Sequence, residues 1–87
     1  MPELTLLSRG YCHLCEEMRD ALAPLAERFH ATVVEIDVDA FPELEATYGD
    51  RVPMLLLGTP AEGVELCRYR LDAKAVTDAL ARAPGFG

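Results

Sequence analysis

Basic residues are scarce in this chain. Its 87 residues include 8 Lys or Arg against 15 Asp or Glu, which gives a formal net charge of −7. A nucleic-acid partner would need clustered Lys and Arg to neutralise its phosphates, so we expect no nucleic-acid binding. The acidic surface instead favours solubility and can orient a protein partner.

Long apolar runs are also missing. No run approaches the ~20 residues that span a bilayer, so we expect no membrane association. The start, Met1-Pro2-Glu3-Leu4, lacks the basic and then apolar pattern of a secretory signal, and we expect a cytoplasmic protein. Structural disulfides are rare in the cytoplasm, where a C-x-x-C pair is typical of redox or metal chemistry.

Repeats and low-complexity segments are absent as well. A hydrophobic content of 51% with 26% charged residues is ordinary for a globular protein. The length and composition predict one domain over residues 1–87, and we expect a monomer.

Cysteine is limited to three residues, two of which form Cys12-His13-Leu14-Cys15. The motif lies between an apolar run and a helix-periodic segment. At such a junction the first sulfur lies over the unpaired N–H groups of the helix start, which stabilise a thiolate together with the helix dipole. The second sulfur lies one turn on and can attack a mixed disulfide formed on the first. The motif therefore predicts thiol–disulfide exchange, with Cys12 as nucleophile and Cys15 as resolving cysteine.

A structural zinc pair is the alternative interpretation of these cysteines. A tetrahedral zinc site needs four ligands, and only Cys67, His13 and His30 remain, without a second closely spaced pair. Redox chemistry is therefore favoured, and we predict no metal site. We expect Cys67 to be a small buried hydrophobe rather than a reactive group.

Apolar residues recur every three or four positions after Cys12, which predicts a helix with one buried face. Cys15 belongs to that face, whereas Cys12 lies at its exposed tip. Pro24 falls inside the span and predicts a kink. The apolar positions are Cys15, Met18, Leu22, Leu25 and Phe29.

Two further helices are predicted from their end signals. The first follows Asp39, the expected N-cap, has Pro42 in its first turn and stops at Tyr48-Gly49. The second is capped by Asp72. Its apolar stripe is Val76, Ala79, Leu80 and Ala83.

Four strands complete the prediction, at residues 4–8, 32–38, 53–57 and 64–69. The turn residues at 58–63 make the last two a hairpin. The resulting order, β-α-β-α-β-β-α, predicts an α/β domain whose parallel start has a right-handed crossover. We expect a four-stranded mixed sheet flanked by helices on both faces.

On these features the chain resembles the thioredoxin superfamily and, within it, the small glutaredoxin-like proteins of bacteria. The resemblance rests on Tyr11-Cys12-His13-Leu14-Cys15, on Tyr48-Gly49-Asp50-Arg51-Val52-Pro53 and on the element order. It implies a thioredoxin-like, glutaredoxin-type fold with a cis Val52–Pro53 bond beside Cys12. It also implies a thiol–disulfide oxidoreductase without a bound cofactor, with glutathione as a candidate co-substrate. The implied partners are disulfide-containing proteins or glutathione mixed disulfides.

Two segments depart from the family pattern. Glutaredoxins usually carry cysteine-proline-tyrosine-cysteine, and after the last strand they have a Gly-Gly pair and acidic residues that hold glutathione. Here that region reads Cys67-Arg68-Tyr69-Arg70-Leu71-Asp72, without glycine. We therefore expect weaker glutathione binding than in glutaredoxins with the complete motif. An iron–sulfur cluster shared between two copies of the chain is a less favoured alternative, because the glutaredoxins that hold such a cluster mostly have a single-cysteine motif.

Substrate contacts are expected from the residues that flank the cysteines and from the Val-Pro segment. Val52 would present a free backbone edge to an extended substrate. Leu14 would be an exposed apolar contact beside the reactive sulfur, and the positive charge of Arg9 would contact an anion. The predicted substrate-binding residues are Arg9, Tyr11, His13, Leu14, Val52 and Pro53.

His13 has two interpretations. It can add positive charge that favours the Cys12 thiolate, or it can be a solvated residue that pairs with Glu16 or Glu17. Function also has two: a glutaredoxin-like oxidoreductase is favoured, and the alternative is a non-catalytic thioredoxin-fold module that uses its cysteines to bind a metal or a partner.

Overall fold

The computed structural model describes residues 2–82. The element order β-α-β-α-β-β-α is confirmed, with one short 3-10 helix in addition. In chain order the elements are β1 (Glu3–Ser8), α1 (His13–Arg28), β2 (Thr32–Asp37), the 3-10 helix η1 (Val38–Ala40), α2 (Pro42–Tyr48), β3 (Met54–Leu57), β4 (Val64–Arg68) and α3 (Ala73–Arg82). No helix in this part of the chain is both long and apolar enough to cross a bilayer.

The four strands form one mixed sheet in the order β2-β1-β3-β4. β1 pairs with β2 in parallel, as a strand–helix–strand crossover requires, and antiparallel with β3. β3 and β4 form the predicted hairpin, with a register shift between Leu55 and Leu56. The apolar runs of β1 and β3 therefore lie at the centre of the sheet, and β2 and β4 form its edges.

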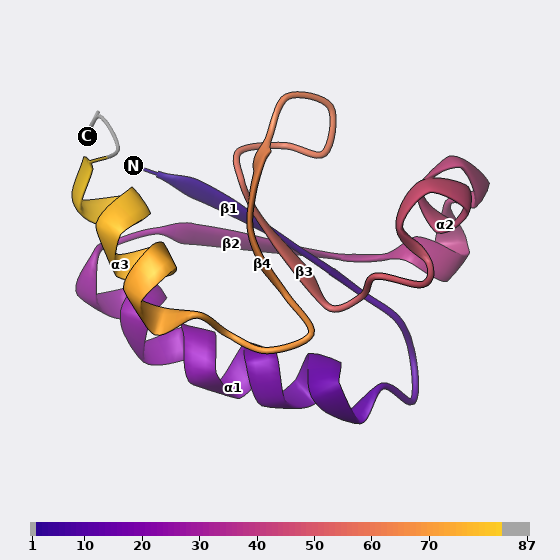
Figure 1. Ribbon diagram of the computed structural model, residues 1–87, viewed down its shortest axis with the longest axis horizontal. Coiled ribbons are helices and arrows are strands. Elements are labelled where there is room, and N and C mark those ends of the chain that lie inside the picture. Colours follow the sequence, from indigo (N-terminus) through magenta and orange to yellow (C-terminus); the bar gives the residue numbers. More distant parts are fainter. Residues whose placement is uncertain (1, 83–87) are drawn as a thin grey trace.

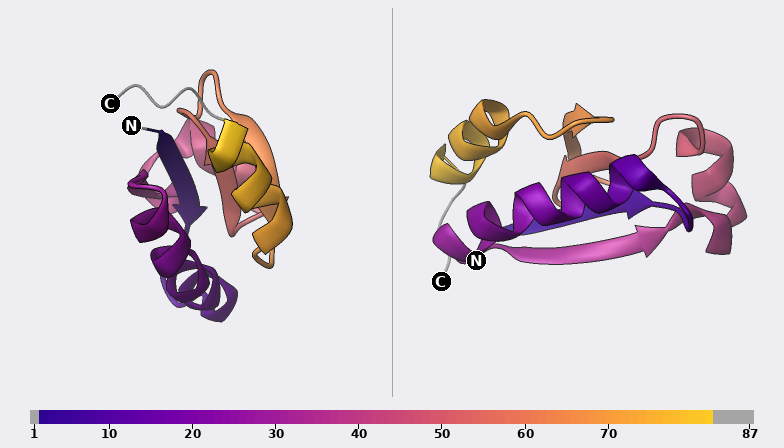
Figure 2. Two further views of the ribbon diagram at one scale, coloured as in Figure 1. Left: turned by 90° about the vertical axis from the view of Figure 1, so that its left-hand side faces the viewer. Right: turned by 90° about the horizontal axis from the view of Figure 1, so that it is seen from below.

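One face of the sheet is covered by α1 and α3, which lie on the same side of it (Figures 1 and 2). Leu4 and Leu6 of β1 point to this face because side chains alternate along a strand. The helical spacing of α1 supplies Met18 and Leu22 to the same cluster. Its buried members are Leu4, Leu6, Met18, Leu22, Leu55, Cys67, Val76 and Leu80.

The other face is covered in part by α2, at the carboxyl ends of β1 and β2 (Figure 1). Leu44 and Tyr48 of α2 pack there against a second buried cluster, formed by Leu7, Val38, Met54 and Leu56. Further along this face the Thr5 hydroxyl is buried and donates to the Gly58 carbonyl at 2.6 Å. The prediction of helices on both faces is therefore confirmed.

Local signals at the start of α2 gave one wrong expectation. Asp39 does not cap α2. Asp37 caps η1 through its carboxylate, which accepts from the Asp39 N–H at 2.9 Å, and Phe41 occupies the N-cap of α2 without a side-chain hydrogen bond. Val38 leaves the predicted strand because it turns into the second cluster, where it is fully buried. The first turn of α2 still begins with Pro42, as expected.

The two other helices follow their predicted signals. α1 continues through Pro24 as one helix to Arg28, and the kink expected at Pro24 stays a prediction. Asp72 caps α3 by accepting from the Ala75 N–H at 3.0 Å. Val76 and Leu80 are buried as the stripe predicts, whereas Ala83 lies outside the described residues.

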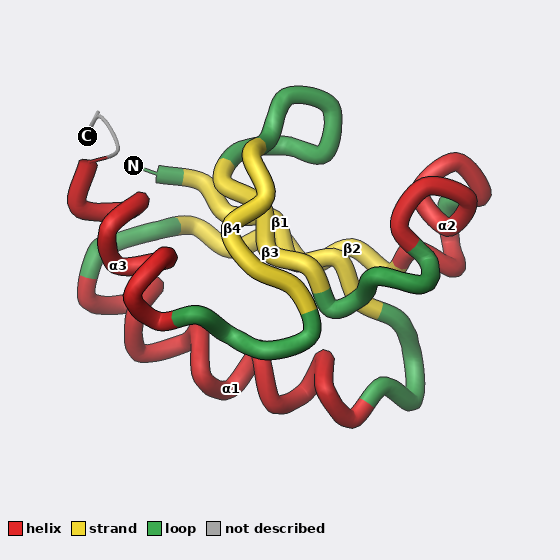
Figure 3. Tube along the Cα trace, in the orientation of Figure 1, coloured by secondary structure: helices red, strands yellow, loops and turns green. Residues whose placement is uncertain are grey.

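Several chain segments meet at one end of the sheet, where β1 and β4 end and β3 begins. The register pairs Leu7 near the end of β1 with Met54 at the start of β3, and Met54 with Arg68 at the end of β4. The connections β1–α1, α2–β3 and β4–α3 therefore all begin or end there, as the tube in Figure 3 shows. This end of the sheet carries the candidate site.

Candidate active site

Cys12 is the N-cap of α1 and has an extended backbone. Its Sγ accepts a hydrogen bond from the Cys15 N–H at 3.1 Å, and its carbonyl accepts from the Glu16 N–H at 3.2 Å. The sulfur therefore lies where the first turn of the helix presents unpaired N–H groups and the positive end of its dipole. The predicted placement of Cys12 over the helix start is confirmed.

The two sulfurs are joined as a Cys12–Cys15 disulfide, with Cα atoms 5.2 Å apart. Cys15 is fully buried on the apolar face of α1, whereas Cys12 is partly exposed. This is the division of accessibility that the helix periodicity predicts. A reagent from solvent can therefore reach Cys12 but not Cys15.

The Val52–Pro53 peptide bond is cis, as expected. Strand register brings this bond to the end of the sheet where β1 ends. β1 ends four residues before Cys12. Within residues 2–82 neither the N–H nor the C=O of Val52 makes a backbone hydrogen bond. Val52 thus has the free backbone edge that pairing with an extended segment requires.

Tyr69 lies at the same end of the sheet, and no sequence motif indicates a role for it. Its backbone is in the left-handed region at φ 68°, which non-glycine residues rarely adopt. Its N–H donates to the Pro53 carbonyl at 2.7 Å, and its hydroxyl donates to the Asp50 carbonyl at 3.0 Å. Tyr69 therefore ties the β4–α3 connection to the segment that carries the cis bond. The only feature of the sequence that pointed to this segment was the absence of the family's glycines at residues 67–72.

Arg9 lies before the motif but its charge already has partners. Its Nη2 is 2.8 Å from Asp39 Oδ1 and 3.5 Å from Glu45 Oε2. Its Nε is buried without a hydrogen-bond partner among the described residues. These contacts hold the β1–α1 connection against η1 and α2. An anionic substrate would have to compete with two carboxylates, and the role of Arg9 in binding stays a prediction.

The residues that flank Cys12 are exposed. Tyr11 is fully exposed with φ 56°, and Leu14 keeps 37% of its surface accessible, as predicted for an apolar contact. His13 Nε2 lies 3.7 Å from Glu17 Oε2, one turn further on. This distance fits the interpretation of His13 as a solvated residue that pairs with Glu17, and its effect on the Cys12 thiolate stays a prediction.

Cys67 is buried in the cluster beneath α1 and α3, as expected. Burial raises the pKa of its thiol, since the thiolate would lose its hydration there. Among residues 2–82 no three His, Cys, Asp or Glu side chains are grouped closely enough to hold a metal ion.

Fold and site together define a thioredoxin-fold protein with a C-x-x-C centre at a helix start. The model of the glutaredoxin-like domain family (DUF836) matches residues 3–81, and the chain belongs to this family. An uncharacterized protein of Mycobacterium tuberculosis is 31% identical, over 94% of this chain and 86% of that protein.

Solved structures agree with this assignment. A structural-genomics target protein from X. campestris has a TM-score of 0.70 and 34% identity, and the match covers 93% of this chain and 99% of that chain. A mutant thioredoxin from Halobacterium salinarum has a TM-score of 0.68 and 32% identity, over 91% and 71% of the two chains. The glutaredoxin-like domain and the thioredoxin-fold neighbours support a redox-type function.

Proposed function

We propose that this protein is a thiol–disulfide oxidoreductase that uses Cys12 and Cys15 as a dithiol. The observation that carries the proposal is the asymmetry of the pair. Cys12 is accessible and accepts the Cys15 N–H at the helix start, whereas Cys15 is fully buried behind it. A helix N-terminus favours a thiolate, which is the form of cysteine that attacks disulfides.

The first step is attack by the Cys12 thiolate on one sulfur of a substrate disulfide. The substrate S–S bond breaks, its other sulfur leaves as a thiolate that takes a proton from solvent, and Cys12 becomes joined to the substrate. The free backbone edge of Val52 would hold an extended substrate during this step.

The second step releases the substrate. Cys15 loses its proton and attacks Cys12 Sγ, which breaks the mixed disulfide and leaves the Cys12–Cys15 disulfide. Two electrons have then passed from the protein to the substrate, which departs as a dithiol or as two thiols. A low-molecular-weight thiol such as glutathione, or a dithiol reductase, would reduce the pair again.

The substrates in this proposal are protein disulfides or glutathione mixed disulfides, and the protein acts as a cytoplasmic monomer. Glutathione would serve as a co-substrate rather than as a bound cofactor. Its binding would be weak, because the 67–72 segment has bulky side chains where close backbone approach favours glycine.

The test is NADPH-coupled reduction of a small mixed disulfide and of an insulin disulfide, with either glutathione and its reductase or a thioredoxin reductase as electron source. We expect turnover by the wild type and none by Cys12→Ser. Cys15→Ser should accumulate a mixed disulfide on Cys12, which mass spectrometry detects. Cys67→Ala is the matched control and should keep its activity, because that thiol is buried away from solvent.

Alkylation gives an independent test of the two roles. Iodoacetamide at neutral pH should modify Cys12 of the reduced protein before Cys15, because only Cys12 is accessible. Equal labelling would contradict the assignment. A protein that reduces neither substrate but binds a metal or a partner through its cysteines would instead be the non-catalytic module.

A further inference from the structure

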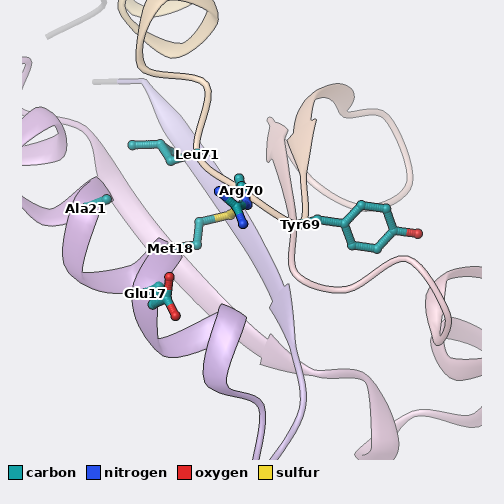
Figure 4. Close-up of a pocket in the computed structure, with 6 residues that line it drawn as sticks. All are labelled: Glu17, Met18, Ala21, Tyr69, Arg70 and Leu71. Atoms are coloured by element: carbon teal, nitrogen blue, oxygen red, sulfur yellow. The ribbon is translucent and has the colours of Figure 1, made fainter.

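A pocket of ≈ 180 Å³ lies between α1 and the β4–α3 connection. Met18, Ala21 and Leu71 supply apolar surface, and the charged side chains of Glu17 and Arg70 also line it. Figure 4 shows Met18 of α1 pointing toward Arg70 of the β4–α3 connection, with the Tyr69 ring pointing away from α1. None of the steps proposed above uses this pocket.

Its volume decides what it can hold. Sites for drug-sized molecules measure roughly 300–1,000 Å³, so a larger organic ligand does not fit. A cavity of about 150 Å³ is known to hold one benzene-sized molecule, so this pocket suits a single large apolar side chain.

The pocket shares one helix with the reactive centre. Met18 lies one turn beyond Cys15 on the same face of α1, about 9 Å along the helix axis from Cys12 at 1.5 Å per residue. The other wall begins at Tyr69, whose N–H bonds to the Pro53 carbonyl beside the free edge of Val52. An extended chain covers that distance in about three residues at 3.3 Å each.

Charge further restricts the occupant. Of the exposed acidic residues of α1, Glu17 lines the pocket, and Glu16 and Asp20 lie elsewhere on the exposed surface of the helix. The positive charge of Arg19 is taken up by Glu35 at 2.6 Å. The α1 wall of the pocket is therefore acidic and complements a basic residue in a partner, whereas Arg70 gives the opposite wall a positive charge.

The geometry points to this pocket as a side-chain subsite for a protein substrate. The occupant is an extended cysteine-containing segment with a large apolar residue about three positions from the attacked cysteine and a neighbouring Lys or Arg. This subsite rests on the proposed function, because the segment is held there while its disulfide is exchanged at Cys12. It would select protein disulfides over small ones.

The test compares disulfide-bonded peptides that differ only at the position expected in the pocket. With the reduced wild type we expect the Leu peptide to react about tenfold faster than the Ala peptide, a discrimination typical of apolar pockets. Exchanging the neighbouring Lys for Glu should slow the reaction about two- to fivefold, as for an exposed ion pair. Moving the Leu next to the cysteine should remove its advantage.

Ala21→Phe fills the pocket from an exposed helix position and should abolish the preference for the Leu peptide. Ala23→Phe is the matched control, because Ala23 is exposed on the opposite side of the same helix. Bis(2-hydroxyethyl) disulfide does not reach the pocket and should react equally with the wild type and both variants. Equal rates for the Leu and Ala peptides, or a preference that survives Ala21→Phe, would overturn the subsite.

If no disulfide reacts, the proposed function fails, and the subsite is tested by binding alone. Peptides with Ser in place of Cys are titrated into the oxidised protein while backbone NMR shifts are followed. Saturable shifts at residues 17–21 and 69–71 with the Leu peptide but not the Ala peptide would support the pocket. Their absence would exclude it.

Discussion

Arg9 tests how the site is held together, because its guanidinium joins the β1–α1 connection to η1 and α2. We expect Arg9→Met to remove this link and to leave disulfide reduction unchanged, contrary to the anion contact expected from the sequence. The physical reason is that the guanidinium already pairs with two carboxylates: Arg9 Nη2 lies 2.8 Å from Asp39 Oδ1 and 3.5 Å from Glu45 Oε2. A substrate anion would gain little by displacing them.

The size of the effect follows from exposure. The side chains of Arg9 and Asp39 are 33% and 52% exposed, so their pair is worth about 0.5–1 kcal/mol, near the upper end for surface pairs. The longer contact to Glu45 is worth less. The buried Arg9 Nε has no partner, and removing such a donor recovers roughly 1 kcal/mol. The single substitution can therefore be nearly neutral, and only the coupling energy is informative.

A double-mutant cycle measures that coupling. Wild type, Arg9→Met, Asp39→Asn and the double variant are unfolded in urea, and we expect a coupling energy of about 0.5–1 kcal/mol. In thermal unfolding this corresponds to about 2–8 °C for a domain of this size. A coupling below about 0.2 kcal/mol, together with a tenfold rise in the KM for glutathione in Arg9→Met alone, would refute the reasoning.

Three further predictions concern stability. The hydrogen bond from Arg19 lowers the pKa of Glu35, so Arg19→Met should destabilise the protein at pH 7. In urea unfolding at a series of pH values, that difference should be present above about pH 4.3 and vanish as the pH falls through the lower folded pKa. Burial raises the pKa of Cys67, so the stability of the oxidised protein should fall as the pH rises above about 8.5; this fall should be smaller in Cys67→Ala. Tyr69→Phe removes the bond to the Asp50 carbonyl and should cost about 0.5–1 kcal/mol in urea; an unchanged midpoint would show that this bond contributes nothing.

The central elements were predictable because local and global signals agree there. The apolar run of β1 and the three-to-four spacing after Cys12 each require burial on one side, and the two meet in one cluster. The C-x-x-C motif reports the helix start for the same reason, since Cys12 acts as the N-cap. Val52 and Pro53 were located through the resemblance of residues 48–53 to the stretch that precedes the family's cis-proline.

The start of α2 shows where local signals fail. Asp39 has the composition of a cap, but its carboxylate bonds to Arg9, thirty positions earlier in the chain. Asp37 performs the capping of η1 instead. Such a choice between partners is decided by tertiary contacts, which residue preferences at single positions do not contain.

Tyr69 escaped prediction for a related reason. Its role depends on a left-handed backbone and on two carbonyls, of Asp50 and Pro53, that come near only when the sheet forms. The pocket next to it depends on the same closure, because one wall comes from α1 and the other from residues 69–71. Neither feature leaves a periodic pattern in the sequence.

Helix α1 carries both the cysteines that would exchange disulfides and one wall of the pocket that would select the substrate. Cys12 caps α1 and Cys15 lies in its first turn, while Met18 and Ala21 line the pocket on the following turns. A helix fixes the spacing between these groups, and sites on such elements are more precise than sites on loops. The opposite wall is a connection whose side chains can change without touching the sulfurs. Substitutions at Arg70 and Leu71 should therefore alter which protein disulfides react, while the rate with a small disulfide stays set by the helix start.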